Sequence, residues 1–127
     1  MTESAFLLDS NIVVWLDQKP ERIPPHVLLM IESATQILLS AVTAWELGIK
    51  QALGDLTLLQ PVLEMLRTHS MTELPVTIQH GEAVRDLPLY HRDPFDRLLV
   101  AQAMIEGLIL VTNNNKLAQY GVPILLV

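Results

Sequence analysis

The segment His91-Arg92-Asp93-Pro94-Phe95-Asp96-Arg97 leads directly into the apolar run Leu98-Leu99-Val100-Ala101-Gln102-Ala103. This order is typical of a helix start, with Asp93 as the N-cap, Pro94 as the first helical residue and Asp96 in the first turn. The acidic pair allows two interpretations. Both carboxylates can serve the helix alone, because they accept free backbone N–H groups and interact favourably with the positive end of the helix dipole. They can also belong to a chemical site, and the other carboxylates of the chain bear on that choice.

On both sides of this segment, short apolar runs alternate with segments of helical period. The clearest strand is Leu108–Val111, a continuous apolar run of the kind found in parallel sheets. The expected strands are 5–8, 36–40, 74–76 (short at most), 108–111 and 123–127. The expected helices are 12–16, 27–34, 41–50, 58–68, 78–87, one from Pro94 that ends at Gly107, and a short one through Tyr120. This alternation predicts one α/β domain over residues 1–127, a three-layer sandwich with a mainly parallel central sheet flanked by helices.

Two of the expected helices have apolar residues at spacings of three and four, which place them on one face. The residues expected to face inward are Val42, Trp45 and Ile49 in helix 41–50, and Leu59, Val62, Leu63 and Leu66 in helix 58–68.

The composition narrows the class of protein. The 127 residues are 50% hydrophobic and 17% charged, which suits a single globular core. The apolar runs are too short to span a bilayer and the N-terminus lacks a signal-peptide pattern, so we expect a cytoplasmic protein without membrane contact. Cysteine is absent, which excludes disulfides and thiolate metal sites. The net charge of −6 argues against nucleic-acid binding through a global positive field, but it leaves room for a local basic rim.

Two further carboxylates occupy apolar surroundings. Asp9 follows the first expected strand, where ligand sites of open α/β sheets collect, although it can equally cap the next helix. Glu46 lies near the edge of the apolar face of helix 41–50. A carboxylate there is costly unless it is paired, hydrogen-bonded or bound to a cation. Lys50, at i+4, offers the alternative of an ordinary surface ion pair.

Parallel topology brings most of these polar groups to the same edge of the sheet. Thr112-Asn113-Asn114-Asn115 also follows a strand, as Asp9 does. Converging carboxylates without an intervening Lys or Arg would repel one another strongly. A hard divalent cation such as Mg²⁺ or Mn²⁺ relieves that repulsion, because it takes oxygen ligands and can activate a bound water.

In these features the chain resembles a PIN domain, and most closely the VapC-type toxins of bacterial toxin–antitoxin pairs. The resemblance covers nearly the whole chain, in four segments that follow one another in register. These segments are Leu7 to Asn11 with Trp15, Ser40 to Lys50, His91 to Ala103, and Leu110 to Thr112.

The resemblance implies a metal-dependent endoribonuclease that hydrolyses RNA phosphodiester bonds with Mg²⁺ or Mn²⁺. Asp9, Glu46 and Asp96 would form the catalytic, metal-binding cluster, and Asp93 would be a supporting ligand or the cap that holds Asp96 in place. Thr112 would lie beside the site. The implied partners are an RNA substrate, a cognate antitoxin protein and a second copy of the chain in a homodimer.

The chain departs from the family pattern at one position. Asn114 stands where the family has an aspartate, and Leu117 offers no replacement. Asparagine can still ligate or orient water through its carbonyl, but without charge, which puts a second metal ion in doubt. The alternative function is therefore a catalytically weak PIN domain that acts as an RNA- or protein-binding regulatory module.

Basic residues and histidines carry weaker signals. Arg92 and Arg97 flank the acidic pair and are candidate phosphate contacts; ordinary surface charge, or an ion pair with Asp86 or Glu106, is the alternative. The histidines are scattered without ligand spacing and are interpreted as structural or surface residues, with a reservation only for His91. A phosphate-handling α/β enzyme with Asp9 as nucleophile is disfavoured, since the haloacid-dehalogenase pattern needs an aspartate where Asn11 stands.

Overall fold

Five parallel strands form one central sheet in the order β3-β2-β1-β4-β5. A computed structural model describes residues 5–127 of the chain. Its strands are β1 (Ala5–Leu8), β2 (Gln36–Ser40), β3 (Thr72–Leu74), β4 (Ile109–Thr112) and β5 (Ile124–Leu126). Every strand pairing among these residues is parallel, so the sheet is parallel throughout rather than mainly parallel.

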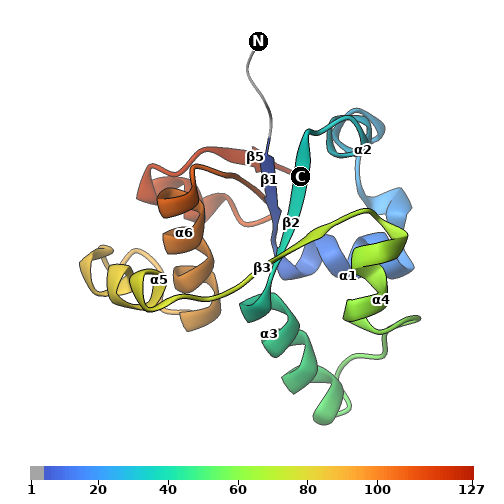
Figure 1. Ribbon diagram of the computed structural model, residues 1–127, viewed down its shortest axis with the longest axis horizontal. Coiled ribbons are helices and arrows are strands. Elements are labelled where there is room, and N and C mark those ends of the chain that lie inside the picture. The colour runs from blue at the N-terminus through green and yellow to red at the C-terminus, as the bar shows by residue number, and fades with distance from the viewer. Residues whose placement is uncertain (1–4) are drawn as a thin grey trace.

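Helices cover both faces of this sheet (Figure 1). They are α1 (Ser10–Gln18), α2 (Pro25–Glu32), α3 (Ala41–Ala52), α4 (Val62–Thr68), α5 (Ile78–Ala83) and α6 (Pro94–Glu106), with short 3₁₀ helices at Pro20–Arg22, Val84–Asp86 and Asn115–Tyr120. The α1, α2 and α4 helices lie on one side, and α5 and α6 lie on the other (Figure 1). The predicted three-layer α/β sandwich is confirmed.

Side chains alternate across the sheet and fill a core on each face. In β1, Phe6 and Leu8 pack into the core on the α1 side, whereas Leu7 packs into the core that contains Leu99 and Val100 of α6. This alternation follows from the two-residue period of a strand. Both faces of β1 are buried, which explains why this strand reads as an unbroken apolar run.

No helix within residues 5–127 is both long enough and apolar enough to cross a membrane. The longest of them, α6, has 13 residues and ends at Gly107, which adopts a left-handed conformation with φ of 68°. Glycine is favoured there because it has no Cβ to clash in that conformation.

The predicted helix over residues 58–68 is too long. Pro61 is the N-cap of α4, and the preceding residues form a loop. That loop is held to α1, since the Leu59 N–H donates to Asp17 Oδ2 at 2.7 Å. Leu59 and Leu63, predicted to face inward, are 76% exposed, and Met65 is buried instead. Val62 and Leu66 pack against the core as predicted.

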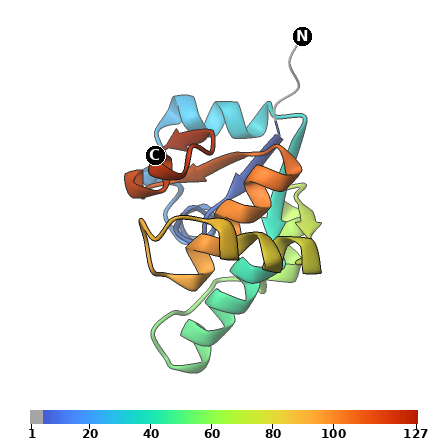
Figure 2. The same cartoon turned by 90° about the vertical axis from the view of Figure 1, so that its left-hand side faces the viewer.

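The predicted inward face of α3 is correct only at its start. Val42 is buried, but Trp45 and Ile49 are exposed, and Leu47 is the next residue that enters the core. The α3 helix extends away from the sheet (Figure 2). Its buried residues are Val42, Thr43 and Leu47, so the face that enters the core is turned away from Trp45 and Ile49. The Trp45 ring instead lies edge-on to Phe95, with 5.0 Å between ring centroids.

Other boundaries also differ from expectation, most clearly at the third strand and at the helix expected over residues 78–87. The third strand is Thr72–Leu74 and stops before Pro75, which has no N–H for a sheet ladder. The predicted helix over 78–87 divides into α5 and the 3₁₀ turn Val84–Asp86.

Candidate metal-binding site

The carboxyl edge of the sheet brings the predicted polar groups together. Asp9 directly follows β1, Thr112 ends β4, and the Asp9 N–H donates to the Val111 carbonyl at 2.9 Å across these two strands. Ser40 ends β2 and caps α3, which carries Glu46 in its second turn. The α6 helix packs against α3 and presents its acidic first turn to the same edge.

Asp9 is held in place through both carboxylate oxygens. Its Oδ1 accepts the N–H of Ser10, the first residue of α1, at 2.6 Å, and its Oδ2 accepts the Thr112 hydroxyl at 2.6 Å. The side chain is 4% exposed. The capping interpretation of Asp9 is therefore correct, but the bond to Thr112 comes from another strand and is not needed for a cap.

The start of α6 has the predicted capping geometry. Asp93 Oδ1 accepts the N–H groups of Phe95 at 2.8 Å and Asp96 at 3.2 Å, and Pro94 is the first helical residue. Asp96 is not part of the cap. Its Oδ2 lies 2.8 Å from His91 Nε2, and its side chain is only 15% exposed.

The surroundings of Asp96 disfavour its ionised form. Burial raises the pKa of Asp96 to about 6, and the charges of Asp9 and Asp93 add to this effect. The hydrogen bond and charge of His91 act in the opposite direction. Asp96 thus lies within the electrostatic reach of two other carboxylates, as expected for acids gathered to share a cation.

Glu46 is the fourth carboxylate of this group. Its side chain is 13% exposed, and burial raises its pKa, with a smaller contribution from Asp93. Lys50 Nζ lies 3.4 Å from Glu46 Oε2 and, together with Ser10, lowers that pKa. The alternative of an i,i+4 ion pair is therefore present in the structure. It does not cancel the cost of burial, since the net shift is upward.

Among the described residues, the tightest set of ligand atoms comes from His91, Asp93 and Asp96. One ligand atom from each lies within 4.8 Å of the others. This set shares Asp93 and Asp96 with the predicted cluster but does not include Asp9 or Glu46. The charge of Asp9 acts on Asp96, and the charge of Asp93 acts on Glu46. The donors are mainly carboxylate oxygens, which suits Mg²⁺ or Mn²⁺.

Sequence reasoning did not identify the contact between His91 and Asp96. The only signal was the position of His91 immediately before the acidic pair. A loop residue five positions from its partner follows no helical or strand period, so spacing rules could not reveal the contact.

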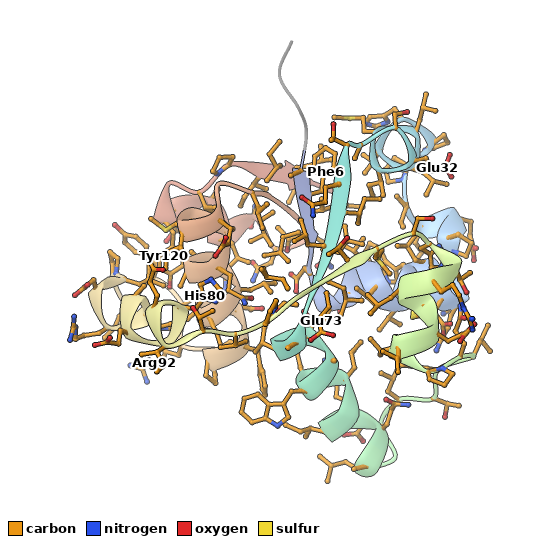
Figure 3. The ribbon with its side chains drawn as sticks, viewed as in Figure 1. Phe6, Glu32, Glu73, His80, Arg92 and Tyr120 are labelled. Atoms are coloured by element: carbon orange, nitrogen blue, oxygen red, sulfur yellow. The ribbon has the colours of Figure 1, made fainter. Side chains whose placement is uncertain are left out.

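The two candidate phosphate-binding arginines differ in their surroundings. The Arg97 guanidinium donates to backbone carbonyls of the preceding loop and to the Tyr120 hydroxyl, and it makes no ion pair with Asp86 or Glu106. Its donors therefore serve the loop. Arg92 is exposed at the surface of that loop (Figure 3) and remains the candidate phosphate contact.

Asn114 supports the local chain. Its Oδ1 accepts the Lys116 N–H at 3.1 Å and caps the following 3₁₀ helix, while its own N–H donates to the Thr112 hydroxyl oxygen at 3.0 Å. Through Thr112 it connects to Asp9. Asn114 therefore adjoins the site without adding a charge to it.

A buried polar network lies between the helices that carry the acids. Ser40 donates to Gln102 Oε1 at 2.5 Å, and the Gln102 amide lies 3.4 Å from His80 Nδ1. Because His80 Nδ1 accepts the Thr77 N–H, a neutral ring carries its proton on Nε2, 2.8 Å from Glu106. Figure 3 shows His80 between α5 and α6. This network fastens the cap of α3 to α6, so His80 is structural, as predicted.

Comparisons with known proteins point to one family. The model of the PIN domain family matches residues 6–123. Ribonuclease VapC22 of Mycobacterium tuberculosis (strain ATCC 25618 / H37Rv) is 30% identical over 124 residues, which covers 92% of each protein.

Solved structures share the fold at lower identity. A chain in DNA-bound VapBC from Salmonella typhimurium superposes with a TM-score of 0.71 at 19% identity, over 96% of this chain and 97% of that one. A chain in FitAcB from Neisseria gonorrhoeae superposes with a TM-score of 0.63 at 22% identity, over 94% of this chain and 95% of that one. Each likeness covers at least 94% of this chain and shows a shared fold.

Proposed function

This chain belongs to the PIN domain family, and we propose that it is a divalent-metal-dependent endoribonuclease of the VapC type. The observation that carries the proposal is the gathering of Asp9, Glu46, Asp93 and Asp96 at one edge of the sheet. Burial and neighbouring carboxylates raise the pKa of Asp96 to about 6. The relative VapC22 is named a ribonuclease, which supports RNA as the substrate.

In this proposal, Asp9, Glu46 and Asp96 hold a Mg²⁺ or Mn²⁺ ion through carboxylate oxygens. When bound, the ion supplies an activated water and stabilises negative charge on the phosphoryl group. Thr112 orients Asp9 through its hydroxyl, and Asp93 fixes the first turn of α6 beneath Asp96. The exposed Arg92 contacts a substrate phosphate.

We further propose that the chain is the toxin of a toxin–antitoxin pair. The solved relatives include a toxin–antitoxin complex from Klebsiella pneumoniae, which supports an antitoxin partner. Large apolar side chains at 62% to 76% exposure, namely Trp45, Leu53, Leu59 and Leu63, support a covering partner near α3 and α4. A homodimer and a cytoplasmic location belong to the same proposal. Sedimentation of the purified protein, alone and with its candidate antitoxin, tests both partners.

The first experiment is cleavage of a mixed RNA pool by purified protein with Mg²⁺ or Mn²⁺. The controls are EDTA and an Asp9→Asn variant whose circular dichroism spectrum matches the wild type. We expect cleavage with either metal ion, and its loss in both controls.

The other outcomes are distinct. Cleavage that survives Asp9→Asn indicates a contaminating nuclease or a different site, and contradicts the proposal. Absence of cleavage in every lane, together with RNA binding, favours the alternative of a catalytically weak binding module. Asn114→Asp is then the first substitution to make.

A further inference from the structure

His91 has one side-chain partner in the acidic group. Its Nε2 lies 2.8 Å from Asp96 Oδ2, with the two side chains 25% and 15% exposed. Asp96 is thus engaged through one carboxylate oxygen by a residue that the family resemblance does not assign to the site.

The backbone of His91 is held by residues remote in sequence. The His91 N–H donates to the Tyr120 hydroxyl at 3.0 Å, and that hydroxyl donates back to the His91 carbonyl at 3.3 Å. Arg97 also donates to the His91 carbonyl, at 3.4 Å, and to the Tyr120 hydroxyl, at 3.3 Å. Loop residues seldom receive so many backbone contacts, because loops are usually exposed and mobile.

The same arginine fixes the rest of the loop. Its guanidinium donates to the carbonyls of Pro88, Leu87 and Val84 at 2.8, 3.2 and 3.1 Å. Arg97 is the residue after Asp96 on α6, so the helix that carries the acid also fixes the loop that carries the histidine. The backbone of the His91 loop is therefore fixed relative to α6, which places the His91 side chain within hydrogen-bond reach of Asp96.

We propose that His91 is a positioning residue for the metal ion, an inference that rests on the proposed function. It holds Asp96 by donating from Nε2 to Oδ2, which leaves Oδ1 as the oxygen that the divalent ion takes. A ligating carboxylate that is already hydrogen-bonded loses less side-chain entropy on binding metal, and removal of such partners weakens metal binding 10- to 100-fold as a rule. His91 itself stays outside the coordination sphere.

The test is a titration with Mn²⁺ in the absence of RNA. The electron paramagnetic resonance signal of free Mn²⁺ measures how much of the ion remains unbound. The variants are His91→Leu, His91→Gln, and His26→Leu as a matched control on the exposed side of α2. We expect His91→Leu to weaken binding about tenfold. His91→Gln keeps an N–H donor of similar reach, so its affinity should stay within about threefold of wild type. His26→Leu should bind as the wild type does.

Pulsed electron paramagnetic resonance of the bound Mn²⁺ distinguishes a histidine that positions Asp96 from a histidine that coordinates the ion itself. A positioning residue predicts no directly coordinated nitrogen in the wild type. A nitrogen coupling that disappears in His91→Leu would make His91 a ligand and overturn the inference. Equal Mn²⁺ affinity of His91→Leu and wild type would overturn it as well. If the wild type itself binds no Mn²⁺, the proposed function fails, and the inference fails with it.

Tyr120→Phe tests the backbone contacts while leaving the His91 side chain intact. The variant keeps the ring that packs edge-on against Tyr90, at 5.2 Å between centroids, and removes only the hydroxyl. We expect Mn²⁺ affinity to fall about threefold, less than in His91→Leu, since Arg97 still holds the loop. A Tyr120→Phe protein with unchanged affinity would contradict the role of this contact.

Discussion

At the start of α6, Asp93 accepts two backbone N–H groups and Asp96 is bonded to His91, whereas on α3 Glu46 has the single ion pair with Lys50. The first pair is tied into the helix cap and the loop before it. Glu46 is half-buried where neither helix nor sheet needs a carboxylate. The comparison teaches that a capping role and a site role do not exclude each other. A buried acid whose ion pair does not offset the cost of its burial, such as Glu46, is the clearer sign of function.

The largest expected effect is on cleavage, and it should be the same on both helices. Asp96→Asn and Glu46→Gln each remove the negative charge of one proposed metal ligand, so the cleavage rate should fall about a hundredfold or more. Single-turnover cleavage of labelled RNA measures this loss, and thermal melting verifies the fold. If Glu46→Gln retains wild-type cleavage while Asp96→Asn does not, Glu46 serves only its pair with Lys50.

The second effect concerns stability and pH. The pKa of Asp96 is raised to about 6, so the folded protein holds this proton more tightly than the unfolded chain. The contribution of this proton to the free energy of unfolding is fully present below about pH 4 and is lost as the pH rises through about 6. Without metal, the free energy of unfolding of Asp96→Asn should therefore be about 1 to 2 kcal/mol higher than that of the wild type at pH 7, and no higher at pH 4. Urea unfolding measures this difference.

Bound metal should reverse the order of stability of the wild type and Asp96→Asn at pH 7. Mn²⁺ stabilises the form that binds it, so saturating Mn²⁺ should raise the wild-type midpoint more than that of Asp96→Asn. A variant that is no more stable than wild type at pH 7 in EDTA would show that Asp96 is not under electrostatic strain.

Asp93 should behave differently from Asp96, because it is the cap. Asp93→Ala removes an acceptor for two N–H groups and should cost about 1 kcal/mol of folding stability. Asp93→Asn keeps an acceptor and should retain most of that stability. Urea unfolding of the two variants at pH 7 distinguishes the cap from the charge, and equal losses would contradict the capping role.

The smallest effect is expected at Lys50. Its charge and hydrogen bond lower the pKa of Glu46, so Lys50→Met should raise that pKa further and move the acidic limb of the cleavage profile to higher pH. At pH 7.5 the rate should change less than about threefold, because the lysine is partly exposed. A pH series of cleavage rates measures the shift. An acidic limb that moves to lower pH would contradict the effect of Lys50 on the pKa of Glu46.

Much of this architecture could be predicted from the residues. The alternation of apolar runs predicted the sandwich, and the Asp93-Pro94 pair predicted the start of α6, because capping is a local interaction. The predicted inward position of Trp45 was wrong, since the spacing of apolar residues did not show that the buried face of α3 is the one that carries Thr43 and Leu47. The contact between His91 and Asp96 depends on a loop held by Arg97 and Tyr120, and such a fold-dependent contact has no sequence period.

The central claim is that one divalent ion held by these carboxylates cleaves RNA. Mn²⁺ binding and RNA cleavage can be followed in one titration of the same wild-type and Asp9→Asn samples. The account predicts that the wild-type cleavage rate rises with site occupancy at a common midpoint, and that Asp9→Asn loses both. Cleavage that is complete before Mn²⁺ binds, or that persists in Asp9→Asn, would contradict it.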